Sequence, residues 1–161
     1  MTKLVTAALV AGFLYAGRAT TQRYYEIFTA PAAARPSATI DLYLEPVNTT
    51  ADELTAHVTS AGWTTNDDVL VLAAASAISP QDLSPVYYSV GYLLYPTHVR
   101  FAAWCDAKAS TMQCNSHAAE TPQAALARYH VRRVIVVGDE NPFRHSHSNR
   151  LSDKVTLVSL P

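Results

Sequence analysis

Three short apolar runs, separated by helix-length segments, constrain the fold of this chain more than any other feature. They cover residues 69–74, 99–104 and 134–138. Strands that are buried on both faces are typically apolar throughout, and spacers of helical length allow parallel pairing through right-handed crossovers. The pattern predicts an α/β fold, with a small three-layer sheet of three to five strands, parallel or mixed, and flanking helices.

Three segments carry the signals that start helices. Thr50 and Glu53 have the spacing of a capping box, which predicts a helix over residues 51–61. Ser79 and Thr121 each precede a proline, which is favoured at the first helical position. They predict helices that end near Tyr95 and His130, respectively.

Two further segments have strand-like patterns. Residues 154–160 alternate between apolar and polar side chains, and no helix is predicted before them, so we expect an antiparallel edge strand reached through a loop over 139–152. Residues 40–44 alternate over too few positions to define a strand clearly, and we expect either an edge strand or a tether lying on the domain.

The N-terminal segment is strongly apolar over residues 4–17, between Lys3 and Arg18. A basic residue followed by such a run is typical of a signal peptide, whereas continuation to residue 28 favours a membrane anchor. A buried helix is the third alternative. We favour an N-terminal apolar helix over residues 1–29 that contacts the membrane through residues 4–28, followed by a Pro/Ala-rich linker over 30–39 and an α/β domain over 40–161.

The composition favours lipid or protein partners over nucleic acid. Only 16% of the residues are charged, against about 25% in an average soluble chain. This shortage favours a surface that meets lipid or another protein. The formal net charge of −1 supplies no broad positive field, so we do not expect nucleic-acid binding.

The predicted sheet places several polar and aromatic residues at the carboxyl ends of its strands, where open α/β sheets bind ligands. The first of these loops, residues 75–79, has no glycine, which disfavours a dinucleotide or P-loop site, and no cofactor is predicted. Serines there also serve as turn and cap residues. The candidate ligand-binding residues are Ser76, Ser79, Trp104, Asp106 and Asp139.

The two cysteines, Cys105 and Cys114, follow the second predicted strand. In an oxidising compartment they form a disulfide; the alternatives are two reduced thiols or half of a metal site completed by His117. His145 and His147 could share a metal in an extended segment, but no third ligand lies near them in the sequence. We therefore predict a disulfide and no metal.

Tyr88, Tyr92 and Tyr95 fall on one stripe of the second predicted helix because they are three or four residues apart. Such a stripe either packs in the core or forms an interface with a partner protein. We retain both interpretations, with these tyrosines as the candidate interface.

The sequence contains no recognised set of catalytic residues. We expect a non-catalytic accessory or interaction subunit of a larger membrane complex, anchored by its N-terminal segment, with its soluble domain outside the cytoplasm. The alternative is a domain, binding protein or enzyme, that holds a phosphate- or sugar-containing small molecule in the crevice at the strand ends. A third possibility is the terminal domain of a longer membrane protein.

Overall fold

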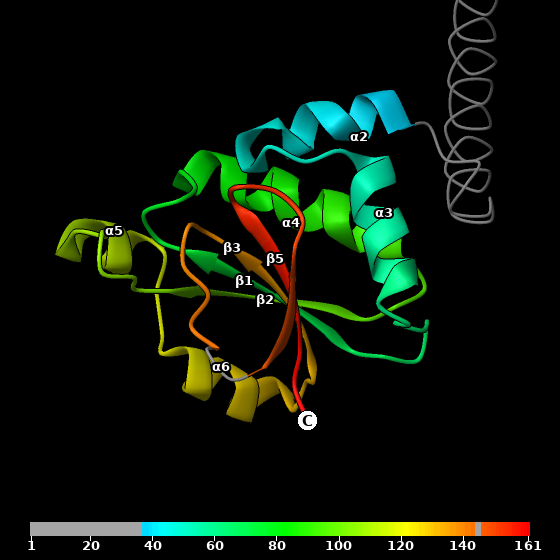
Figure 1. The fold of residues 1–161 in the computed structure, drawn as a ribbon. Helices are drawn as coiled ribbons and strands as arrows, with labels where there is room; N and C mark the ends of the chain where they lie inside the picture. Colours follow the sequence, from blue (N-terminus) through cyan, green and yellow to red (C-terminus); the bar gives the residue numbers. More distant parts are fainter. Residues whose placement is uncertain (1–36, 144–145) are drawn as a thin grey trace, which may run out of the picture. The chain divides into compact units, whose positions relative to one another are not determined.

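The computed structural model describes residues 37–143 and 146–161 (Figure 1). The predicted apolar helix over residues 1–29 lies outside the described residues, as do most of the linker and His145. No helix of the described part of the chain combines the length and the apolarity of a membrane span. The elements are, in order, α2 (Ser37–Leu44), the 3-10 helix η2 (Glu45–Val47), α3 (Ala51–Ser60), β1 (Val69–Ala74), α4 (Pro80–Leu94), β2 (Val99–Trp104), α5 (Thr111–Ser116), α6 (Pro122–Tyr129), β3 (Arg133–Val137), β4 (His147–Arg150) and β5 (Val155–Ser159).

The sheet has five strands in the order β2-β1-β3-β5-β4. Strand β1 pairs in parallel with both β2 and β3, and Val69 lies opposite Val99 on one side and Arg133 on the other. Strand β5 is antiparallel to β3 and to β4. The predicted α/β class and the parallel pairing of the three apolar runs are confirmed, and the sheet as a whole is mixed.

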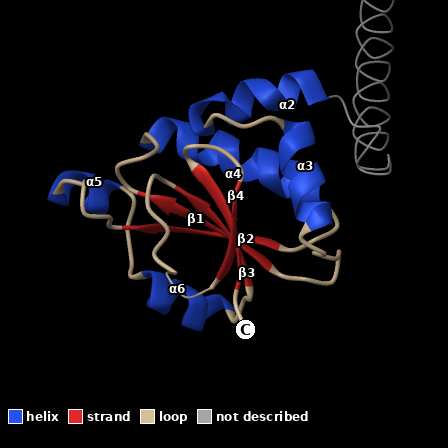
Figure 2. Cartoon of the chain, in the orientation of Figure 1, coloured by secondary structure: helices blue, strands red, loops and turns tan. Residues whose placement is uncertain are grey.

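Helices cover both faces of this sheet (Figures 1 and 2). Helices α2, α3 and α4 lie on one face, and α6 lies on the other. Each face has its own hydrophobic core, and β1 contributes alternate residues to the two: Val69, Val71 and Ala73 to one, Leu70, Leu72 and Ala74 to the other. This two-sided burial explains why the β1 run is apolar throughout.

The predicted helix starts are confirmed. Thr50 and Glu53 form the capping box of α3, and the side chains of Ser79 and Thr121 accept hydrogen bonds from the first turns of α4 and α6. In the sheet order, β2 lies on one side of β1 and β3 on the other. The connection from β1 to β2 therefore runs across the sheet in one direction, and the connection from β2 to β3 runs in the opposite direction. Right-handed crossovers then require α4 and α6 to lie on opposite faces, as observed.

The expectation of an edge strand over residues 40–44 is wrong. These residues belong to α2, which lies on the domain and contacts α4 and α3. Leu44 is fully buried in the core under α4, and the Asp41 carboxylate accepts a hydrogen bond of 2.7 Å from the backbone N–H of Ala51. Tertiary packing of this kind overrides a short alternating pattern.

The last predicted strand is antiparallel as expected, but it is not at the edge. Strand β4 lies outside it, in the segment predicted to be a loop. All four β4 residues are exposed and polar, so they carry none of the apolar signal on which strand prediction depends.

At the opposite edge of the sheet, the outward carbonyl groups of β2 accept hydrogen bonds from two side chains and one backbone N–H. The carbonyls of His98 and Trp104 accept from the N–H groups of Val69 and Ala75, at the two ends of β1. The carbonyls of Val99, Phe101 and Ala103 therefore face outward. The hydroxyl of Tyr87 in α4 donates to Val99, and that of Tyr129 in α6 donates to Phe101. The backbone N–H of Glu120 donates to Ala103. These bonds protect the edge from pairing with another chain.

Candidate functional site

The carboxyl ends of β1, β2 and β3 meet at one edge of the sheet. Because β2 and β3 lie on opposite sides of β1, the strand order reverses at β1. Open α/β sheets bind ligands at such a reversal. The residues that follow the three strands are therefore the first place to look for a site.

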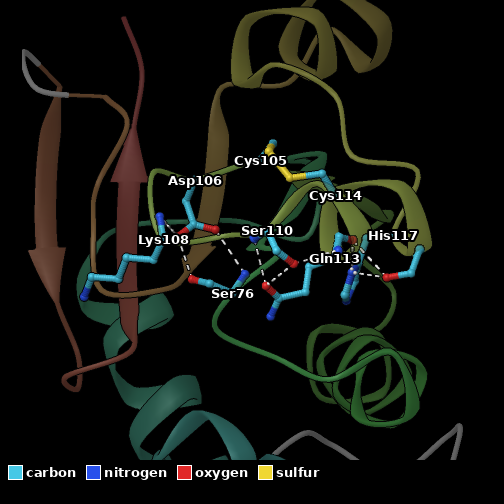
Figure 3. Close-up of a disulfide and its surroundings, with 9 residues drawn as sticks. Ser76, Cys105, Asp106, Lys108, Ser110, Gln113, Cys114 and His117 are labelled. Carbon is cyan, nitrogen blue, oxygen red and sulfur yellow. Dashed lines mark hydrogen bonds between the residues drawn. A yellow bond between two sulfur atoms is a disulfide. The ribbon is translucent and has the colours of Figure 1, made fainter.

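Asp106 joins the loop after β1 to the loop after β2 (Figure 3). Its side chain is buried, with 6% of the residue exposed. One carboxylate oxygen accepts from the backbone N–H of Ser76 at 3.0 Å, and the other accepts from the Ser76 hydroxyl at 2.5 Å and from the Lys108 N–H at 3.2 Å. A buried carboxylate needs such donors, and here they come from within the domain.

Lys108 reaches from the loop after β2 to the loop after β3. Its ammonium lies 2.7 Å from the Asp139 carboxylate, and both side chains are more than half exposed. The hydrogen bond raises the pKa of Lys108 and lowers the pKa of Asp139. Surface pairs of this kind contribute little stability, so the pair can open for a ligand at small cost.

At Gly138, the end of β3 approaches the end of β1 very closely. Its φ is +151°, and a Cβ atom built on it would lie 2.7 Å from the Ala74 Cβ. Its N–H donates to the Lys154 carbonyl at 2.7 Å. The two strands thus meet through a glycine, and no side chain of residue 138 projects into the crevice.

No family model matches the chain, and no curated protein sequence or solved structure matches it significantly.

The predicted disulfide is present. Cys105 and Cys114 are joined, with their Cα atoms 5.2 Å apart, and together they close the loop that carries Asp106 and Lys108 (Figure 3). Among the described residues there is no free cysteine and no group of three or more metal-ligating side chains. His117 bonds the Gln113 carbonyl through Nδ1, and His147 lies exposed on β4.

The structure brings three of the five candidate ligand residues together and separates the other two. Ser76, Asp106 and Asp139 gather around the loop of Lys108. Ser79 instead caps α4, where its hydroxyl accepts from the Asp82 N–H and donates to the Asp82 carboxylate. Trp104 is 8% exposed and packs in the core on the α6 face. Sequence analysis did not select Lys108, although its position two residues after Asp106 was a usable signal.

The stripe of tyrosines on α4 is divided between two environments. Tyr88 is 70% exposed and its ring lies 5.2 Å from that of Tyr87, and Tyr95 is 48% exposed. Tyr92 is partly buried and packs against the core. Tyr88 is thus the most exposed of the three, whereas Tyr92 belongs mainly to the domain itself.

Among the described residues, a larger and a smaller groove lie away from the strand ends. The larger, of about 670 Å³, has four carboxylates among its lining residues. The N–H of Thr50 donates to Glu53 and holds the pKa of that carboxyl below its usual value, and Asn48 donates to Asp153. The smaller, of about 350 Å³, lies between the end of α3 and strands β4 and β5. The acidic residues of the larger groove are Asp41, Glu45, Glu53 and Asp153.

Sequence analysis did not predict either groove, because the residues that line each groove come from segments about a hundred residues apart in the chain.

Proposed function

We propose that this chain is a membrane-tethered, non-catalytic interaction module. In this proposal, residues 4–28 hold the chain at a membrane and the α/β domain binds a partner protein within a larger membrane complex, on the side away from the cytoplasm. The apolar run over residues 4–17 and the low charged fraction of 16% support the membrane tether.

The observation that carries the partner-binding role is the exposure of large apolar and aromatic side chains on two helices that pack against each other. Tyr88 on α4 is 70% exposed, and Leu42 and Tyr43 on α2 are 65% and 47% exposed. Tyrosine is enriched at protein interfaces because its ring supplies contact area and its hydroxyl a hydrogen bond. Helices α2 and α4 cover the same face of the sheet (Figure 2).

The state of the strand-end residues also supports a non-catalytic role. Asp106 uses both carboxylate oxygens to hold Ser76 and Lys108. Ser79 is used as a helix cap. Groups that are occupied in this way stabilise the loops, and a substrate would have to displace bonds that hold the domain together.

A second candidate function is a binding site for a small molecule at the strand ends. It is favoured by the gathering of Ser76, Asp106, Lys108 and Asp139 at the reversal of strand order. The two carboxylates beside Lys108 suit the hydroxyl groups of a sugar better than a phosphate, whose negative charge they would repel.

The membrane tether is tested by fractionation of the full chain against a variant that lacks residues 1–29. We expect the full chain to stay with membranes after a high-salt wash, and the shortened chain to become soluble with an unchanged circular dichroism spectrum over the domain. A Leu9→Asp/Phe13→Asp variant keeps the chain length, and we expect it to leave the membrane as well, because each charge costs about 3 kcal/mol at the centre of a membrane helix. Retention of either variant on membranes contradicts the proposal.

A further inference from the structure

Helix α5 is held differently from the helices that cover the sheet. It has six residues and none of them is buried, whereas α6 buries Ala125 and α4 buries Val86 and Val90. Figure 1 shows α5 projecting beyond the end of the sheet. A helix shorter than about 12 residues is marginal in water, so α5 needs support from outside its own backbone.

The local contacts of α5 supply only part of that support. Ser110 and Gln113 form a capping box at its start, with both residues on the same short segment. At its end, Ala118 adopts a φ of +47°, a left-handed conformation that is unfavourable for a residue with a Cβ atom. His117, which is half-buried, bonds back to Gln113. These contacts order the segment internally but do not fasten it to the sheet.

The disulfide fastens α5 to the sheet. Cys114 lies in α5, and Cys105 follows the last residue of β2 (Figure 3). Cys105 is exposed and Cys114 is half-buried. A thiolate must reach one sulfur from solvent to exchange with a disulfide, and the exposure of Cys105 allows that approach.

We propose that the Cys105–Cys114 disulfide is a thiol-exchange site, and that its reduction by a dithiol releases α5 while the sheet stays folded. The first thiolate of the dithiol attacks Sγ of Cys105, which forms a mixed disulfide and expels Cys114 as a thiolate that takes up a proton. The second thiolate of the dithiol then attacks the dithiol sulfur that is bonded to Cys105. A disulfide forms within the dithiol, and Cys105 leaves as a thiolate that takes up a proton. The protein gains two electrons and two protons, and the dithiol is oxidised to a disulfide.

The contacts on either side of the loop limit how far the release extends. On one side, Asp106 stays bound to the N–H and hydroxyl of Ser76. On the other, the N–H of Glu120 donates to the Ala103 carbonyl of β2. The N–H groups of Lys108 and Ala109 also bond to Asp106, so the released segment covers residues 110–119. Lys108 keeps its ion pair with Asp139 in both redox states.

The proposal is tested by hydrogen exchange of the full chain, oxidised and after treatment with millimolar dithiothreitol. We expect the amides of residues 111–119 to exchange about tenfold faster or more after reduction, with the amides of β1 and β3 unchanged. The thermal midpoint should fall by less than about 3 °C. Reduction increases the conformational entropy of the unfolded chain, but a loop that is also free in the folded state gains nearly the same entropy there, so the free energy of unfolding changes little. A Cys105→Ser/Cys114→Ser variant should match the reduced protein and should not respond to the dithiol.

Three results would overturn the proposal. The first is full protection of α5 in the reduced protein. The second is a fall in the thermal midpoint on the order of 10 °C with loss of protection in β1 and β3, which is the behaviour of a structural staple. The third is a disulfide that millimolar dithiothreitol does not reduce in the folded protein.

Discussion

Replacement of Gly138 by alanine is expected to destabilise the domain by about 2–6 kcal/mol. The new Cβ atom would lie 2.7 Å from the Ala74 Cβ, and Ala74 is buried at the end of β1. Overpacking of a core costs about 1–3 kcal/mol, and a positive φ at a residue with a Cβ atom costs a further 1–3 kcal/mol. Urea unfolding of the full chain in mild detergent measures the effect, followed by the fluorescence of the two buried tryptophans, Trp63 and Trp104.

Two other glycines are matched controls for this substitution. At Gly62 the φ is +70° but no atom lies within 4 Å of the added Cβ, so only the conformational cost of about 1 kcal/mol is expected. At Gly91, inside α4, neither cost applies, and alanine should stabilise the protein by about 0.5–1 kcal/mol. An equal loss at Gly138 and Gly62 would contradict the close approach of the two strands.

Replacement of Asp106 by alanine is expected to cost about 3 kcal/mol. The carboxylate is buried and accepts from the N–H and hydroxyl of Ser76 and from the N–H of Lys108. Hydrogen bonds to charged groups contribute about 1.5–3 kcal/mol, and donors that lose their acceptor add a desolvation cost. The same unfolding experiment gives the loss in free energy, and hydrogen exchange locates it in the loops after β1 and β2.

The Asp106 prediction also has matched controls. Asp106→Asn keeps one oxygen acceptor and should lose about half as much. Asp82→Ala removes a partly exposed carboxylate whose bond to Ser79 lies at the start of α4, and it should cost less than about 1 kcal/mol. A loss at Asp106 no larger than that at Asp82 would mean that Asp106 does not hold the strand-end loops together.

The parts of the fold that sequence predicted are those with strong local signals. The β1 run is apolar at every position because both of its faces are buried, and the caps at Thr50, Ser79 and Thr121 use local hydrogen bonds that depend only on nearby residues. Helix α2 and strand β4 were missed for the opposite reason. Leu44 is helical because it packs under α4, and β4 is a strand because β5 supplies hydrogen-bond partners.

For the candidate site, sequence predicted which residues gather at the strand ends but not the distances between them. Topology alone placed Ser76, Asp106 and Asp139 at one edge, since the carboxyl ends of parallel strands lie together. The bond between Ser76 and Asp106, thirty residues apart, and the approach of Gly138 to Ala74 depend on how β1, β2 and β3 pack. No pattern of neighbouring residues encodes those distances.

In the proposed function, the domain binds its partner through the exposed side chains of α2 and α4, which are Leu42, Tyr43 and Tyr88, and the residues at the strand ends stabilise the fold. Photo-crosslinking of the full chain in its native membranes tests this claim, with benzoylphenylalanine placed in turn at Tyr88 on α4, at Lys108 at the strand ends, and at the exposed Gln123 on α6. We predict one discrete crosslinked protein from position 88 and none from positions 108 and 123. A crosslinked protein from position 108 with none from position 88 would contradict the account.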